Sequence, residues 1–220
     1  MREPKSAKSR LAGILSDDER SRLSLALLRR VLGAVESSAA RYCVVVSSSP
    51  ASISQTTGKF SKVVLVQERK FHGGVNSAIQ DGIAALSLNP KVTSSSQARS
   101  SVMFIPSDLP FLDKGSIEEA ARLLENFDAV ISPSRRRDGT TLLGFHTVEE
   151  KLARKFQFHY DDDSFNKHIR ELRNLRLNYS ILESDKFSFD IDNLEDLELA
   201  RKIVGAKSYS DFISVLLNGF

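Results

Sequence analysis

The stretch VMFIPSDLP at residues 102–110 decides the predicted fold. Its four leading apolar residues are typical of a buried central strand, and Pro106 and Pro110 force the chain out of the sheet directly afterwards. Asp108 is therefore expected on a stiff turn at the carboxyl end of a strand, where open α/β sheets place their ligand sites. Taken alone, such an aspartate is more often a turn residue or a helix cap than a metal ligand.

The composition limits the classes of protein to which this chain can belong. Of its 220 residues 41% are hydrophobic and 27% are charged, as in an ordinary globular domain. No apolar stretch reaches the roughly 20 residues of a membrane helix, and the N-terminus lacks a secretory signal, so we expect a cytoplasmic protein with no membrane partner. The 31 basic and 28 acidic side chains are too balanced for a general nucleic-acid binder. The single cysteine, Cys43, is expected in the core.

Helical and extended patterns alternate along the first 132 residues. Ser16 and Glu19 form a capping box before a helix that should end near Ser37, and a helical pattern recurs from Val75. Apolar runs predict strands at residues 43–46, 63–66 and 129–132, and a helix at 116–125 again opens with a serine and a glutamate three apart. Because crossovers between parallel strands need helices, the fold class is α/β, with a parallel sheet between helices.

The C-terminal third follows a less regular pattern. It predicts a strand at 141–145, helices at 148–156 and 164–174, and strands near Tyr179 and Phe187, whereas residues 93–101 are expected to form a polar surface loop. A last helix should begin after Asp192 and end at Gly205. The apolar residues Phe212, Val215 and Leu216 predict an amphipathic tail that packs onto the sheet or onto a second subunit.

Two segments in the first half have the residue types of a nucleotide site. Lys8 and Arg10 combine a compact charge with a planar fork, which suits a polyphosphate, although a solvated terminus is the commoner explanation. Gly73 and Gly74 stand at the mouth of a helix, where free backbone N–H groups favour an anion or a polar ring, and Asn76 adds a donor and an acceptor. A simple turn is the alternative for these glycines.

Two acidic residues near the C-terminus are candidate partners of Asp108. Asp190 and Asp192 alternate along an expected strand, so that their side chains should point to opposite faces. One of them could meet Asp108 and complete an oxygen-ligand site for magnesium. The alternative is a helix-capping role for Asp192 with Glu195.

The remaining polar motifs are less specific. Arg135, Arg136 and Arg137 precede a turn with hydroxyl groups, which suits an anionic substrate, but three adjacent arginines more often form a solvated loop. The histidines show no metal-binding spacing, and His168 is expected on the surface of a helix, with a position facing the substrate lobe as the alternative.

Six segments in this order resemble one protein family: AKSRL, GGVNSAI, PSDLPFL, DGT, DSFNKH and FDIDNLEDL. It is the guanylyltransferase family that activates 2-phospho-L-lactate, or phosphoenolpyruvate in some members, during biosynthesis of the deazaflavin coenzyme. The resemblance covers residues 7 to about 203. It implies a nucleotidyltransferase fold of the glycosyltransferase-A kind, Rossmann-like, in a single domain over residues 1–220 from which the usual first strand is missing. Residues 1–132 would form a nucleotide-binding half, 133–192 a substrate-binding half and 193–220 the C-terminal helices.

The resemblance also implies roles for individual residues. Mg²⁺ would be held by Asp108 with Asp192, or else Asp190, and the catalytic residues would be Lys8, Arg10 and Asp108. GTP would be bound by Lys8, Arg10, Gly73, Gly74, Asn76 and Ser107. The phosphorylated carboxylic acid would be bound by Thr140, Asp161 and Ser164. A homodimer is possible, and the alternatives are a nucleotidyltransferase acting on molybdopterin or a sugar phosphate, or a silent nucleotide-binding protein.

Overall fold

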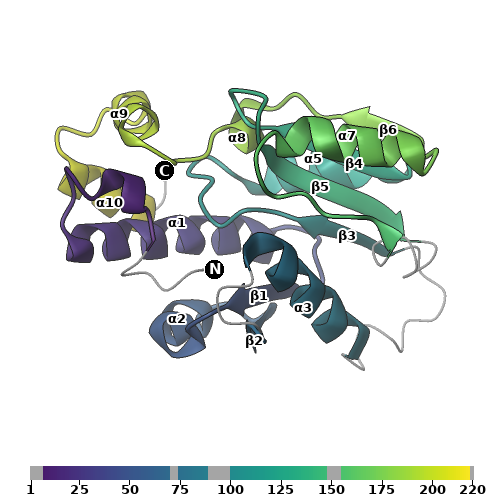
Figure 1. The fold of residues 1–220 in the computed structure, drawn as a ribbon. Helices are drawn as coiled ribbons and strands as arrows, with labels where there is room; N and C mark the ends of the chain where they lie inside the picture. Colours follow the sequence, from purple (N-terminus) through teal and green to yellow (C-terminus); the bar gives the residue numbers. More distant parts are fainter. Residues whose placement is uncertain (1–6, 70–73, 89–99, 148–154, 219–220) are drawn as a thin grey trace.

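Two β-sheets form the framework of the computed structural model, which describes residues 7–69, 74–88, 100–147 and 155–218 (Figure 1). In the smaller sheet β1 (Cys43–Ser47) runs parallel to β2 (Val63–Gln67). The larger sheet has the strand order β3-β5-β4-β6, made of β3 (Ser100–Phe104), β5 (Thr140–Thr147), β4 (Ala129–Pro133) and β6 (Tyr179–Ile181). Only β5 runs against its neighbours, so β3, β4 and β6 share one direction. The expected α/β class with a mostly parallel sheet is confirmed.

The described part of the chain has no ladder of hydrogen bonds between β1 and β3, so the two sheets remain separate. Every residue of β4 is buried because it has a strand on each side, whereas β1 and β2 are mostly half-buried.

Helices cover both faces of the larger sheet, as the alternating pattern predicts. On one face Val130 and Leu142 pack with α5 (Lys114–Leu123) and with the end of α1 (Asp17–Ser37). On the other face Ile131 and Phe145 pack with α7 (Ser164–Asn174). The remaining helices are α2 (Pro50–Thr57), α3 (Gly74–Leu88), α8 (Asp185–Ser188), α9 (Leu194–Ile203) and α10 (Tyr209–Asn218).

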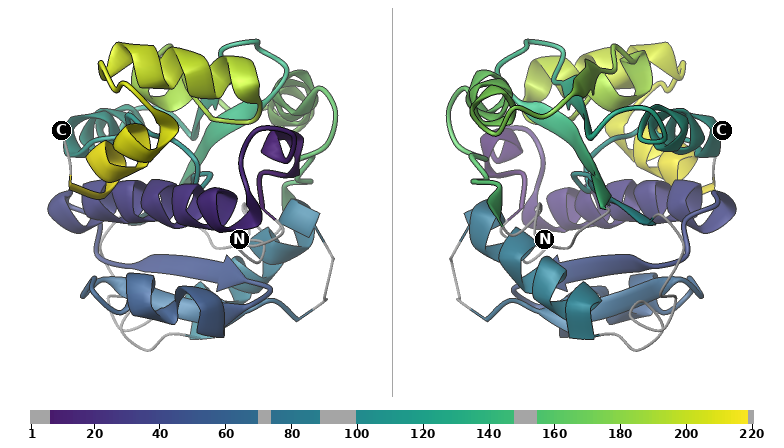
Figure 2. Two further views of the ribbon diagram at one scale, coloured as in Figure 1. Left: turned by 90° about the vertical axis from the view of Figure 1, so that its left-hand side faces the viewer. Right: turned by 90° about the vertical axis from the view of Figure 1, so that its right-hand side faces the viewer.

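The long helix α1 begins at the predicted capping box and carries a large share of the core. The Ser16 hydroxyl accepts from the backbone N–H of Glu19, whose side chain returns to the Ser16 backbone. Figure 2 shows α1 crossing the middle of the molecule, with the β1-β2 sheet on one side and α9 on the other. Phe212 and Leu216 of α10 pack against Leu23 of α1. The expectation that this tail lies on the sheet is therefore wrong.

Several local predictions near the C-terminal helices are also wrong. Phe187 lies in the short helix α8, not in a strand, and the chain around Asp190 and Asp192 forms a loop. The cap of α9 is Asn193, whose side chain accepts from the backbone N–H of Asp196, so the alternative cap of Asp192 with Glu195 is incorrect. Gly205, with φ of +69°, follows the end of α9 as expected.

Two further differences concern helix ends and segments outside the described residues. The cap of α5 is Asp113, which accepts from the backbone N–H of Ser116, so the expected serine cap is wrong by three residues. Most of the expected helix at 148–156 and of the loop at 93–101 lies outside the described residues. None of the described helices is long and apolar enough to cross a membrane.

Candidate active site

One edge of the larger sheet gathers the segments on which the sequence places chemistry. Because β5 is antiparallel to β3 and β4, its first residue, Thr140, lies at the edge where those strands end. The chain leaves β3 at this edge and turns through Asp108. The backbone N–H of Ile191 donates to the Asp108 carbonyl at 3.3 Å, which brings the loop before α9 to the same place.

Lys8 lies at the centre of a cluster of acidic groups. Its backbone adopts a left-handed conformation with φ of 54°, and the short turn that follows buries Leu11 completely in the core. The Lys8 Nζ lies 2.7 Å from Asp108 Oδ2 and 3.7 Å from Asp192 Oδ1, and it also donates to the carbonyl of Ile191. The structure thus brings Asp108 and Asp192 to Lys8, which precedes both of them by 100 or more residues in the sequence.

Arg10 forms the outer part of this cluster. Its Nη1 lies 3.8 Å from Asp192 Oδ2, and 72% of its side chain is exposed, in contrast to 10% for Lys8. An exposed guanidinium at the rim, next to a buried ammonium, is an arrangement that can meet an incoming polyphosphate.

Burial and neighbouring charges shift the pKa values of Asp190 and Lys8. Burial and the charges of Asp108 and Asp192 raise the pKa of Asp190 to about 7. Burial alone would lower the pKa of Lys8, but the charge and hydrogen bond of Asp108, with Asp192 and Asp190, raise it above its ordinary value. Asp108, Asp190 and Asp192 therefore all interact with the positive charge of Lys8, which is the buried cation of this cluster.

The donor set fits a magnesium ion that also contacts phosphate. Within the described residues no group of three or more acidic, histidine or cysteine side chains is arranged to hold a metal. Mg²⁺ needs fewer, because it commonly takes one or two carboxylates and completes its shell with water and substrate phosphates. Asp108 Oδ1 is buried and has no hydrogen-bond partner among the described residues. An unpartnered carboxylate oxygen of this kind is a ligand that a hard cation prefers.

The arginine run does not present free charges to a substrate. Arg135 and Arg136 bind the Asp196 carboxylate at 3.0 and 3.3 Å, and Arg137 pairs with Glu183 at 2.7 Å. Asp196 Oδ2 also accepts from the backbone N–H groups of Asp192 and Asn193. Sequence reasoning missed Asp196, which fixes the loop carrying Asp192, although its place three residues after Asn193 is a capping-box signal.

Replacement of Asp196 by alanine should destabilise the protein by about 1–3 kcal/mol, because it removes a buried carboxylate that accepts from two half-exposed arginines and two backbone N–H groups. Glu195 offers a matched control, since it faces the same two arginines but its side chain is 77% exposed. We expect Glu195→Ala to change the free energy of unfolding by less than about 0.5 kcal/mol. Urea unfolding measures both, and equal losses would contradict this description.

Two of the three residues expected to bind the acid lie together. The Ser164 Oγ, at the start of α7, accepts from the backbone N–H of Thr140 at 2.9 Å, and both side chains are buried. The exposed carboxylate of Asp161 instead accepts a hydrogen bond from Lys167 Nζ at 2.8 Å. The structure therefore brings Thr140 and Ser164 together, whereas Asp161 pairs with Lys167.

The residues expected near the nucleoside are only partly described. Gly73 lies outside the described residues, whereas Gly74 opens α3 with φ of +75°, which a glycine tolerates without strain. Asn76 Oδ1 accepts from the backbone N–H of Tyr160 at 2.9 Å, so its side chain joins α3 to the segment before α7. Ser107 is half-buried in the turn next to Asp108.

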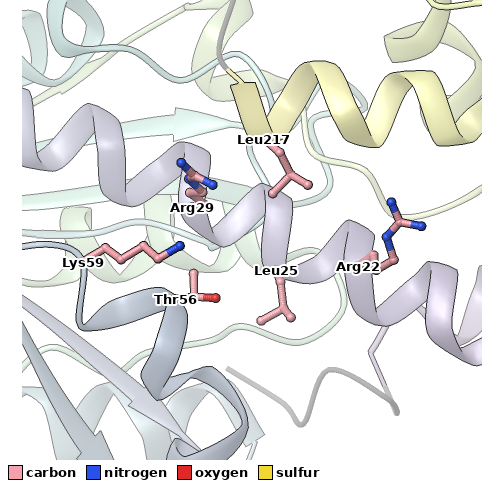
Figure 3. Close-up of a pocket in the computed structure, with 6 residues that line it drawn as sticks. All are labelled: Arg22, Leu25, Arg29, Thr56, Lys59 and Leu217. Atoms are coloured by element: carbon pink, nitrogen blue, oxygen red, sulfur yellow. The ribbon is translucent and has the colours of Figure 1, made fainter.

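A cavity of about 180 Å³ lies elsewhere, between α1, α2 and α10 (Figure 3). None of the expected site residues lines it, and neither does any carboxylate. Its lining consists of Arg22, Leu25, Arg29, Thr56, Lys59 and Leu217. The candidate active site is therefore the open sheet edge around Lys8 and Asp108.

Comparisons with known proteins identify the family and the fold of this chain. A family model described as guanylyl transferase CofC like matches residues 1–210. A 2-phospho-L-lactate guanylyltransferase of Methanocaldococcus jannaschii is 29% identical over 192 residues, which cover 87% of this chain and 75% of that protein. A phosphoenolpyruvate guanylyltransferase of Rubrobacter xylanophilus is 27% identical over 198 residues, which cover 90% of this chain and 88% of that protein. A solved structure from Desulfovibrio desulfuricans, assigned as a nucleotide-diphospho-sugar transferase, matches 99% of this chain and 94% of its own with a TM-score of 0.69 at 15% identity. This last similarity concerns the fold alone.

Proposed function

This chain belongs to the family of CofC-like guanylyl transferases, and from that premise we propose that it transfers GMP from GTP to a small phosphorylated carboxylic acid. The acid is 2-phospho-L-lactate or phosphoenolpyruvate, which are the substrates in the names of several relatives, whereas one other relative is named for 3-phospho-D-glycerate. The product would serve biosynthesis of the deazaflavin coenzyme. The observation that carries the proposal is the convergence of Lys8, Asp108 and Asp192, with one oxygen of Asp108 left without a hydrogen-bond partner in the described part of the chain.

The reaction requires no covalent enzyme intermediate. A phosphate oxygen of the acid attacks the α-phosphorus of GTP, the bond from this phosphorus to the bridging oxygen of the β-phosphate breaks, and pyrophosphate leaves with that electron pair. The product contains a new diphosphate linkage between GMP and the acid. Catalysis of such a step consists of positioning and of neutralising the charge on the phosphates.

The residues of the cluster divide these tasks. Asp108 and Asp192, with Asp190 as the alternative ligand, would hold Mg²⁺, which supplies Lewis-acid stabilisation of the phosphates when bound. Lys8 holds a fixed positive charge beside the same carboxylates, and Arg10 offers a second one at the rim. Thr140 and Ser164 would bind the acid at the adjacent edge of the sheet, and Asn76 would contribute to the nucleoside side of the site.

A matrix of substrates tests the proposal. GTP, ATP and CTP are each combined with 2-phospho-L-lactate, phosphoenolpyruvate and 3-phosphoglycerate in the presence of Mg²⁺, and products are identified by mass. We expect GTP with one of the first two acids to give the guanylylated acid and one equivalent of pyrophosphate. Efficient use of ATP or CTP instead would indicate another kind of nucleotidyltransferase. Binding of nucleotide without pyrophosphate release would indicate a silent binding protein.

A further inference from the structure

A buried histidine lies behind the two hydroxyl groups of the acid subsite. His168 is in α7 and is 0% exposed, so the sequence-based expectation of a surface histidine is wrong. Its imidazole lies edge-on to the Tyr160 ring at 4.9 Å between centroids and next to the Phe156 ring at 5.6 Å. These contacts fix the plane of the imidazole within the core.

The hydrogen bonds of His168 determine which ring nitrogen carries the proton. The backbone N–H of His159 donates to Nε2 at 2.8 Å, and a backbone amide can only donate, so Nε2 is unprotonated. In a neutral imidazole the proton is then on Nδ1, which lies 2.9 Å from Thr140 Oγ1. Burial and the nearby His159 lower the pKa of His168 to about 4, and Asp161 opposes this only in part, so the ring is neutral at physiological pH.

This arrangement decides what the Thr140 hydroxyl can do. Because Oγ1 accepts the Nδ1–H of His168, the hydroxyl proton of Thr140 must point to another partner. The contact between the hydroxyls of Ser164 and Thr140 is long, at 3.4 Å, while Ser164 Oγ already accepts from the Thr140 backbone N–H. The Ser164 hydroxyl proton is therefore directed at Thr140 Oγ1, and the Thr140 hydroxyl proton is the one left without an acceptor among these groups.

We propose that His168 is a positioning residue that orients the Thr140 hydroxyl as a hydrogen-bond donor toward the phosphorylated acid. The inference rests on the proposed function, because it takes the acid to be the ligand of the hydroxyl pair. His168 also ties the backbone at His159 to the start of β5, and so holds three segments of the subsite in one geometry. The ligand that the neutral Thr140 donor fits is a carboxylate or a phosphate.

Two conservative variants separate positioning from packing. In His168→Asn the amide nitrogen can replace Nδ1 and still donate to Thr140, whereas in His168→Gln the longer amide can replace Nε2 and accept from His159. If the hydrogen bond from His168 to Thr140 supports binding of the acid, the His168→Asn variant should keep the KM for the acid within about threefold of that of the natural protein. Gln should raise this KM by about 10- to 100-fold, the value of a hydrogen bond to a charged group, with kcat and the KM for GTP much less affected.

A merely structural role predicts the opposite order, because glutamine is closer to histidine in size. Equal or better function of the Gln variant would therefore overturn the proposal. Calorimetric titration with phosphoenolpyruvate measures the dissociation constant of the acid for each variant, and it compares the two variants without requiring turnover. ¹⁵N spectra of labelled histidine should show His168 with its proton on Nδ1, and a proton on Nε2 would also overturn the proposal. Absence of guanylylated product from the natural protein would instead count against the proposed function.

Discussion

Asp108→Asn should lower kcat/KM for guanylyl transfer by about 10³-fold or more while the protein remains folded. Asparagine preserves the shape of the side chain and can still accept a hydrogen bond from Lys8, which now lies 2.7 Å from Asp108 Oδ2. It removes the negative charge that a magnesium ion requires from its ligand, and losses of this size follow when preorganised charge at a reacting phosphate is lost. Pyrophosphate release at saturating Mg²⁺ measures the effect.

The exposed Asp18, in the first turn of α1, provides the matched control. Asp18→Asn carries the same chemical change away from the cluster and should leave turnover within about twofold, since exposed substitutions of this kind have small effects. Circular dichroism should show the same helix content in both variants and in the natural protein. Turnover of Asp108→Asn near that of the control would remove Asp108 from the metal site.

Lys8→Met should reduce both stability and activity, and its loss of stability should depend on Mg²⁺. The substitution leaves Asp108, Asp192 and the carbonyl of Ile191 without their buried cation, which costs about 3 kcal/mol without metal. If Mg²⁺ binds the same carboxylates, it should restore more stability to the variant than it adds to the natural protein. Turnover should still fall by at least about 10²-fold, because the metal does not replace the second positive charge at the triphosphate.

Thermal unfolding with and without Mg²⁺ measures this difference. Lys207→Met is the control, because Lys207 is exposed just beyond the end of α9. Its midpoint should shift with Mg²⁺ as the natural protein's does. An equal shift for Lys8→Met would mean that lysine and metal do not share the carboxylates.

The elements that depend on local signals could be predicted from the sequence. The capping box at Ser16 and the apolar stripe that begins at Leu23 define α1 without any partner, and the β-branched run at 63–66 defines β2. The turn at Asp108 follows from its flanking prolines. The convergence of Lys8 with Asp108 was implied only by family resemblance, because no spacing rule links residues 100 positions apart.

The remaining features depend on tertiary contacts that leave no periodic signal. Phe187 lies in a single helical turn and packs in the hydrophobic core. A buried apolar residue in so short an element gives the same sequence signal in a helical turn as in a short strand. His168 falls on the buried face of α7, where the core contacts of its ring and its two hydrogen bonds offset the usual preference of histidine for an accessible position. Asp196 was missed because its partners Arg135 and Arg136 lie about 60 residues away.

The most direct test of the central claim, that the Lys8–Asp108–Asp192 cluster performs guanylyl transfer, follows the two ends of the triphosphate separately. The protein is incubated with Mg²⁺, a phosphorylated acid, and GTP labelled with ³²P at either the α- or the γ-phosphate. We predict that the α label enters the guanylylated acid and the γ label appears in pyrophosphate, with both transfers lost in Asp108→Asn. Release of the γ label as inorganic phosphate, or retention of both labels in GTP, would contradict the claim.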